Sequence, residues 1–297
     1  PYILQPQYHP ELKLSSNIFA SEKLEEIIPQ SEIIFVATPS KIINDVLDRL
    51  TDFSIDNKMI ISCTKGINEN PFMTMSEAIE KHFNNSSIKV GVLSGPNLAK
   101  EIADEKVAGT VIASKHADLC HQAREILSSS TFKIYTSDDI KGIELAGALK
   151  NIYAIISGYC HSLDVGENAI GLILTRSMAE MSNFAVNKGA NPITFLGLAG
   201  MGDLVATCFS KLSRNYQFGW AIGEGLDIEA AKYKVGQVAE GLNTIRIIHN
   251  EISSSKIKMP LVSGMHEILF NSGSKELLLE QIINSDIYVD VDFDVES

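Results

Sequence analysis

The chain has 297 residues, of which 45% are hydrophobic and 21% are charged, a composition typical of a well-cored globular protein with room for two ordinary domains. Its formal net charge of −12 argues against a broad surface for nucleic acid or for an anionic membrane, although a few focused cations would suffice for one phosphate. No apolar run approaches the roughly 20 residues of a membrane span, and the scattered cysteines and histidines indicate neither a disulfide framework nor a metal site.

In the first half of the chain, short apolar runs typical of strands alternate with helical patterns. Such alternation predicts a parallel, doubly wound sheet of the Rossmann-like α/β class, with helices on both faces. The expected strands are 32–38, 59–63, 89–93, 110–113 and 132–135, and the expected helices between them are 40–50, 72–83, 97–104 and 116–127.

After about Ser137 the pattern changes to long helical segments with no comparable strand between them. We therefore expect an α/β domain over residues 1–137 and an all-α domain over residues 138–297. For the closing segment 285–297, an edge strand and a mobile acidic tail both fit the alternation of acidic and apolar residues. The expected helices of the second domain are 139–162, 168–187, 203–209, 215–223, 239–250 and 259–270.

Three motifs follow successive predicted strands of the first domain: ATPS (37–40), TKG (64–66) and SGPNLAKE (94–101). The carboxyl ends of neighbouring parallel strands meet at one edge of a sheet, where ligands bind in open α/β folds. Each motif alone contains residues, such as Pro and Gly, that are common in ordinary turns at strand ends. Their repetition at equivalent positions predicts that Pro39, Lys65 and the Gly95–Asn97 turn point into one crevice.

Lys150 interrupts the apolar pattern of the helix ELAGALKNIYAIISG, residues 144–158. A lysine in such a position usually extends its ammonium group to water. Here its neighbours one turn away are the small residues Ala146, Gly147 and Ala154, which would leave room for a ligand. The helix also lies at the junction of the two predicted domains, where ligand sites are common.

Two polar motifs follow in the helical half. In GLAGMGDLVATC (197–208), Asp203 fits the N-cap of a helix and also an acid that holds the Lys150 ammonium in place, two roles that are compatible. In KLSRNYQFG (211–219), Ser213 and Arg214 suit a phosphate dianion, but on these residues alone a capped helix with a solvated arginine is the better interpretation.

Taken together, these motifs and QVAEG (237–241) resemble those of the bacterial NAD(P)-dependent glycerol-3-phosphate dehydrogenases, in the same order and over nearly the whole chain. The resemblance implies an enzyme that interconverts dihydroxyacetone phosphate and sn-glycerol 3-phosphate with NAD or NADP, mostly for glycerophospholipid synthesis. It implies that residues 1–137 are the dinucleotide-binding domain, that residues 138–297 are the substrate-binding domain, and that Lys150 transfers the proton. It also implies substrate contacts for Lys65, Gly95, Asn97, Lys150, Asp203, Ser213, Arg214 and Asn215, and cofactor contacts for Lys65, Ala99, Arg214, Val238 and Glu240.

The chemistry agrees with these roles. Reduction of a ketone by hydride transfer builds an alkoxide, which needs a positioned acid. A lysine can serve near neutral pH if burial and a second cation lower its pKa. Lys65 would be that second cation, and Asp203 would hold the geometry.

Two alternatives stay open at this point: a hydroxyacid dehydrogenase of the same architecture that acts on a carboxylate, and a non-catalytic relative that binds a metabolite. The GxGxxG motif of the family's first strand, turn and helix is not in this sequence. We expect the native protein to carry it on an N-terminal segment of about 40 residues. We also expect a cytoplasmic protein with free thiols that could form a homodimer.

Overall fold

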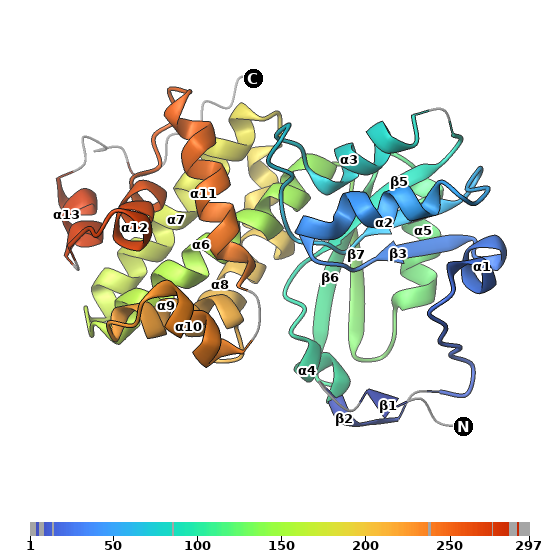
Figure 1. Cartoon of the computed structure of the whole chain (residues 1–297), viewed down its shortest axis with the longest axis horizontal. Helices are drawn as coiled ribbons and strands as arrows, with labels where there is room; N and C mark the ends of the chain where they lie inside the picture. The colour runs from blue at the N-terminus through green and yellow to red at the C-terminus, as the bar shows by residue number, and fades with distance from the viewer. Residues whose placement is uncertain are drawn as a thin grey trace.

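The computed structural model describes residues 4–5, 9–13, 15–84, 86–236, 239–274, 276–284 and 290. Segment 285–297 therefore lies outside the description except for Asp290. A half built on a β-sheet and a half built of helices lie side by side (Figure 1). None of the helices in the described part of the chain is both long and apolar enough to cross a membrane.

A five-stranded sheet with the order β3-β4-β5-β6-β7 forms the core of the first half. The predicted strands are confirmed, with bounds that differ by at most a few residues. The pairs β3–β4, β4–β5 and β6–β7 are parallel, whereas β5 and β6 are antiparallel. The strands are β3 (Ile33–Val36), β4 (Met59–Ser62), β5 (Lys89–Ser94), β6 (Ala108–Ser114) and β7 (Phe132–Ser137).

The antiparallel pair corrects the expectation of an entirely parallel sheet. Helix α4 (Ala99–Ala103), between β5 and β6, has five residues and none that is buried. A helix of that length spans about 7.5 Å, whereas the six residues of β5 extend over about 20 Å. Because α4 is too short to return the chain across the sheet, β6 begins near the end of β5 and runs back along it.

Helices cover both faces of the sheet, as a doubly wound fold requires. Apolar residues of α2 (Ile43–Leu50) and α3 (Met75–His82) pack on one face against β3, β4 and β5. On the other face α5 (Ala117–Leu127) packs against β4, β6 and β7. The remaining elements of this half are β1 (Leu4–Gln5), β2 (His9–Lys13), α1 (Leu24–Ile27) and the 3-10 turns η1 (Ile28–Gln30) and η2 (Ser40–Ile42).

Helix α6 (Ile140–Ser162) is the centre of the helical half and is buried from Gly142 to Cys160. The surrounding helices α7, α8, α9 and α11 all pack against it. Helices α10 and α13 were not predicted; the other long helices were. The elements are α7 (Glu167–Asn187), η3 (Pro192–Leu196), η4 (Leu198–Gly202), α8 (Asp203–Cys208), α9 (Arg214–Gly223), α10 (Ile228–Val235), α11 (Glu240–Ser253), α12 (Pro260–Phe270) and α13 (Leu277–Ile283).

The small residues of α6 allow neighbouring parts of the chain to pack closely against this helix, more than they leave open space. A Cβ atom at Gly158 would lie 2.0 Å from the carbonyl oxygen of Tyr216 on α9, so only glycine permits this approach of the two helices. A Cβ atom at Gly147 would lie 2.4 Å from Oγ of Ser94, the last residue of β5. Gly147 thus allows α6 to lie directly against the carboxyl end of the sheet, one helical turn before Lys150.

Candidate active site

The carboxyl ends of β3, β4 and β5 meet at one edge, as the three strand-end motifs predict. Thr64, which follows β4, donates from Oγ1 to the carbonyl oxygen of Thr38, which follows β3 (2.8 Å). Lys65 donates from Nζ to the carbonyl oxygen of Gly95, which follows β5 (2.8 Å). Gly95 itself has a φ of +153°, a conformation that favours glycine. The three loops are therefore tied into one surface.

Asp203 joins this edge to the helical half. Its side chain is 1% exposed, and its two carboxylate oxygens accept hydrogen bonds from two different lysines. Oδ2 accepts from Nζ of Lys65 at 2.8 Å, and Oδ1 accepts from Nζ of Lys150. Asp203 is the first residue of α8 and its side chain caps no helix, so the N-cap interpretation is wrong and the ammonium-holding one is correct.

Lys150 does not extend to water, because its side chain is only 7% exposed. Besides Asp203, its ammonium group donates to Oγ1 of Thr207, one turn further along α8 (2.7 Å). The pKa of Lys150 is lowered from 10.5 to about 7, mainly by burial and next by the charge of Lys65, while the charge of Asp203 opposes the change. Lys150 can therefore give or take a proton near neutral pH.

The two ammonium groups each keep an unused donor. A lysine ammonium has three N–H groups, and the structure gives two acceptors to Lys65 and two to Lys150. The remaining N–H groups can bind a ligand oxygen placed between them. Such a pair of donors in a buried site would stabilise negative charge on that oxygen.

Four buried polar atoms at the same edge have no hydrogen-bond partner among the described residues. Buried polar groups usually have one, because leaving them unpaired costs free energy, so this concentration at three strand ends indicates a place for ligand or water. The side chain of Asn97 is fixed in position, since its Nδ2 donates to Oγ1 of Thr110 (2.9 Å) while its Oδ1 stays unpaired. The four atoms are Thr38 Oγ1, Ser62 Oγ, Ser94 Oγ and Asn97 Oδ1.

The three residues of the SRN motif have different surroundings. Ser213 is the N-cap of α9 and accepts from the backbone N–H of Tyr216 (3.3 Å). Asn215 is buried; it donates to Oδ1 of Asn151 (3.0 Å) and accepts from the N–H of Gly241 (2.9 Å). Arg214 is exposed, and its side chain has no ion pair or hydrogen bond with any residue that the structure describes. Its guanidinium group is free for an anion.

Three further residues that were predicted to contact the cofactor differ in their surroundings. Glu240, the first residue of α11, accepts from Oγ of Ser40 in the ATPS motif (3.0 Å), which links the two halves directly. Ala99 is exposed at the start of α4. Val238 lies outside the described residues.

Sequence reasoning assigned no role to Thr207, Ser94, Thr38 or Asn151. Thr207 could have been found from its position four residues after Asp203, which places both on one face of a short helix. The unpaired hydroxyl groups of Ser94 and Thr38 have no such signal, because only the packing of α6 and the neighbouring strands leaves them buried.

Comparison with known proteins gives a consistent set of relatives. Residues 4–120 match the family model described as NAD-dependent glycerol-3-phosphate dehydrogenase N-terminus, and residues 139–280 match its C-terminus. The chain is 44% identical to the glycerol-3-phosphate dehydrogenase [NAD(P)+] of Pseudomonas syringae pv. tomato, over 97% of this chain and 84% of that protein. It is 43% identical to that of Alcanivorax borkumensis, over 97% and 83%.

A solved structure agrees with these matches. The crystal structure of glycerol-3-phosphate dehydrogenase from Coxiella burnetii superposes with a TM-score of 0.90 at 30% sequence identity. The superposition covers 95% of this chain and 86% of that chain. The two chains therefore share their fold over nearly the whole length of this chain.

Proposed function

The chain belongs to the family of NAD(P)-dependent glycerol-3-phosphate dehydrogenases, and we propose on this basis that it reduces dihydroxyacetone phosphate reversibly to sn-glycerol 3-phosphate. The observation that carries the proposal is the Lys65–Asp203–Lys150 group, in which a buried lysine has a pKa of about 7. The alternatives, a hydroxyacid dehydrogenase or a non-catalytic relative, are not favoured, because the similar relatives are named glycerol-3-phosphate dehydrogenases.

The residues at the carboxyl edge of the sheet fit a nicotinamide cofactor, because ligands of open α/β sheets bind at this edge and four polar atoms there have no hydrogen-bond partner among the described residues. Lys65, Ala99, Arg214 and Glu240 would hold it, together with Val238. The reduced nicotinamide, when bound, supplies the hydride. The unpaired N–H groups of Lys65 and Lys150 orient the substrate's carbonyl oxygen.

Lys150 gives the proton that turns the developing alkoxide into the alcohol, and it takes the proton back in the reverse direction. Asp203 and Thr207 hold the Lys150 ammonium group in place through hydrogen bonds. Arg214 binds the phosphate of the substrate in a bidentate manner, and Gly95, Asn97, Ser213 and Asn215 complete the substrate site. The negatively charged phosphate of the substrate thus meets Arg214, whose side chain has no acidic partner in the described part of the chain.

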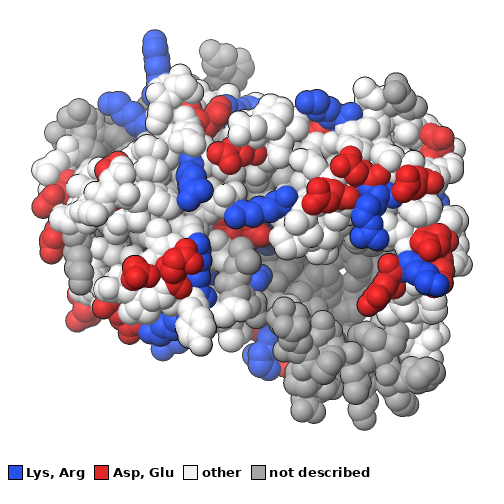
Figure 2. All heavy atoms as spheres, in the orientation of Figure 1, with Lys and Arg blue, Asp and Glu red and all other residues white. Residues whose placement is uncertain are grey.

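The wider setting is part of the same proposal. Glycerol 3-phosphate made by this chain would enter glycerophospholipid synthesis in the cytoplasm, and the enzyme would act as a homodimer. The four cysteines, which form no disulfide among the described residues, fit a reducing compartment. Acidic and basic side chains alternate over the face seen in Figure 2, which fits a small phosphorylated substrate better than nucleic acid.

The experiment that tests the proposal is an assay of dihydroxyacetone phosphate reduction with NADH and with NADPH, on the wild type and on Lys150→Ala. We expect the variant to lose at least about a hundredfold in turnover, the usual scale for a positioned acid, while its circular dichroism is unchanged. Lys232→Ala, on the exposed surface of α10, is the control and should retain wild-type turnover. Near wild-type turnover of Lys150→Ala would remove Lys150 from the mechanism.

A further inference from the structure

The loop 66–74, which joins Lys65 to α3, leaves the α/β half and packs into the helical half. Ile67, two residues after Lys65, is 4% exposed and belongs to the hydrophobic core of the helical half. Phe72 packs against Phe184 of α7, with ring centroids 6.0 Å apart and an interplanar angle of 65°. Nζ of Lys188, at the end of α7, lies 4.8 Å from the centroid of the Phe72 ring. The segment that follows Lys65 is therefore anchored in both halves.

The two ends of this loop are joined to each other. The backbone N–H of Asn68 donates to the carbonyl oxygen of Met73 (2.9 Å), and the N–H of Met73 donates to the carbonyl oxygen of Asn68 (3.1 Å). Asn68 lies three residues after Lys65, and Met73 lies three residues before Ser76 in the first turn of α3. This bridge couples a displacement of Ser76 to a displacement of Lys65.

Glu144 of α6 holds Ser76, the far end of this path. The side chain of Glu144 is buried; its Oε1 accepts from the backbone N–H of Ser76 (2.9 Å), and its Oε2 accepts from Oγ of the same residue. A second link between the two helices joins Nζ of Lys141 to Oε1 of Glu77 (2.5 Å). That ion pair is partly exposed on both sides, and such pairs contribute little to stability. Glu144 is therefore the stronger hold on α3.

Helix α6 also carries or contacts the other partners of Lys65. A Cβ atom at Gly147 would lie 3.8 Å from Cγ of Lys65, so the stem of the lysine passes close to the helix there. Lys150, three residues further on, donates to the carboxylate of Asp203 that also accepts from Lys65. Glu144, Gly147 and Lys150 follow one another at a spacing of three residues, which places neighbours in this series on one side of a helix. One helix therefore fixes both ammonium groups.

We propose that Glu144 is a positioning residue for the reaction: by holding the first turn of α3 on α6, it keeps the ammonium group of Lys65 beside that of Lys150. The catalytic consequence rests on the proposed function, whereas the placement of Lys65 rests on the contacts alone. Glu144 lies outside the substrate site and acts through the loop 66–74. A displacement of about 1 Å can cost on the order of a hundredfold in rate, so a slight loosening of this loop is measurable.

The placement of Lys65 is tested by trace labelling of lysines in the full chain with acetic anhydride, read by mass spectrometry. Glu144→Ala removes both hydrogen bonds to α3, and we expect it to raise the labelling rate of Lys65 about fivefold, because local opening exposes the ammonium group. Glu144→Gln should label like the wild type, since its amide oxygen can accept from the N–H of Ser76 and its amide nitrogen can donate to Oγ.

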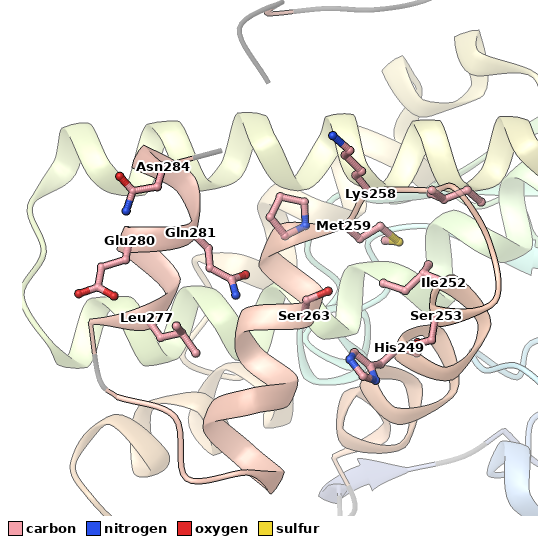
Figure 3. A pocket seen from close by; sticks show the side chains of 12 residues that line it. His249, Ile252, Ser253, Lys258, Met259, Ser263, Leu277, Glu280, Gln281 and Asn284 are labelled. Carbon is pink, nitrogen blue, oxygen red and sulfur yellow. The ribbon is translucent and has the colours of Figure 1, made fainter. Parts of the chain in front are cut away.

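An exposed lysine elsewhere in the chain is the internal reference for this labelling. Lys258 lies at a cavity of about 590 Å³ between α11, α12 and α13, none of whose lining residues belongs to the loop 66–74 or to α3 (Figure 3). Its labelling rate should be the same in the wild type and in every variant. A rise at Lys65 alone would then report the loosened loop and not a general loss of structure.

The catalytic consequence is tested by the pH dependence of kcat for reduction of dihydroxyacetone phosphate. In Glu144→Ala we expect kcat to fall about tenfold. Because the charge of Lys65 lowers the pKa of Lys150, a displaced Lys65 lets that pKa rise, and the pH of half-maximal activity should move up. A mere loss of stability would reduce the amount of active enzyme and leave that pH unchanged. Glu144→Gln should restore both quantities.

Glu180→Gln is the matched control. Glu180 is also a buried carboxyl group that accepts from one hydroxyl and from one backbone N–H, those of Tyr153 and Leu261. Its substitution should change neither the labelling of Lys65 nor the pH of half-maximal activity. A change in either quantity as large as that in Glu144→Ala would contradict a specific role for Glu144.

Two further results would overturn the proposal: labelling of Lys65 at the wild-type rate in Glu144→Ala, or an unchanged pH of half-maximal activity in that variant. If Glu144→Ala does not fold, Ser76→Ala takes its place. It removes only the hydroxyl donor, and it should raise the labelling of Lys65 about twofold; the wild-type rate would overturn the proposal. If the wild type does not reduce dihydroxyacetone phosphate, the proposed function fails, while the labelling still decides whether Glu144 positions Lys65.

Discussion

Helix α6 offers two buried polar side chains, three residues apart, that face very different acids. Lys150 contacts Asp203 at the junction of the two halves, and Tyr153 contacts Glu180 within the helical core. Burial lowers the pKa of Lys150 to about 7 and raises that of Glu180 to about 8. Strongly shifted pKa values therefore occur at both places, although only one lies at the crevice.

The difference between them is in the hydrogen bonds that remain unused. Glu180 accepts from the hydroxyl of Tyr153 (3.0 Å) and from the backbone N–H of Leu261 at the start of α12 (2.7 Å), so it joins α6, α7 and α12. The ammonium groups of Lys150 and Lys65 each keep a free N–H. A shifted pKa marks a catalytic site only where such a donor also faces a place for ligand.

Among the substitutions that test this comparison, Asp203→Asn should have the largest effect on turnover. Removing one partner of a buried ion pair leaves the other charge uncompensated, at a cost of about 3–5 kcal/mol, and we expect turnover to fall about a hundredfold. Asp203 raises the pKa of Lys150, so the pH at which the remaining activity is half-maximal should also move to lower pH. Steady-state kinetics across pH measures both the turnover and the pH of half-maximal activity. If that pH does not change, Asp203 does not influence the pKa of Lys150.

Arg214→Ala should have an intermediate effect, on binding rather than on turnover. Losing a bidentate contact to phosphate costs on the order of 2 kcal/mol, so the KM for dihydroxyacetone phosphate should rise about thirtyfold. The fold should not change, because Arg214 is exposed and has no partner in the described part of the chain. Arg124→Ala, exposed on α5, is the matched control. If neither the substrate KM nor the cofactor KM rises, the phosphate lies elsewhere.

Glu180→Gln should have the smallest effect on catalysis, leaving turnover within about twofold of the wild type. Its effect is on stability. Because the folded pKa of Glu180 is raised from 4.5 to about 8, the stabilisation from its protonated form is complete below the unfolded value and is lost as pH rises through about 8. Above that pH the variant should be more stable, by an amount on the order of 3 kcal/mol. Urea unfolding at acid and alkaline pH would measure this difference in stability. A large loss of turnover in Glu180→Gln would contradict the view that Glu180 is structural and not catalytic.

Much of the fold could be predicted because its apolar patterns are strong. The strands β3, β4 and β5 are apolar runs, and α6 is buried along most of its length. Helix α10 was missed because only Ala231 is buried in it, so it has no apolar stripe to detect. The antiparallel β6 was missed because direction depends on the short α4. The predicted boundary at residues 137 and 138 stays a prediction.

The candidate site was predictable only where side-chain type and position in the chain agree. Lys65 was found from strand-end topology, Lys150 from one charge in an apolar helix, and Asp203 from the glycine-rich motif that precedes it. The structure brings all three side chains together. The catalytic and binding roles of all the site residues stay predictions, as does the N-terminal GxGxxG segment; these residues are Lys65, Gly95, Asn97, Ala99, Lys150, Asp203, Ser213, Arg214, Asn215, Val238 and Glu240. Thr207 needed the packing of α8 on α6, which no local pattern specifies.

The account depends most on the pKa of Lys150, and the pH dependence of kcat tests it directly. Reduction needs the protonated lysine, so kcat for reduction of dihydroxyacetone phosphate should fall as pH rises through about 7, approaching tenfold per pH unit. Oxidation of glycerol 3-phosphate needs the neutral lysine, so its kcat should rise through the same pH. A kcat for reduction that stays constant between about pH 6 and pH 9 would show that Lys150 is not the proton donor.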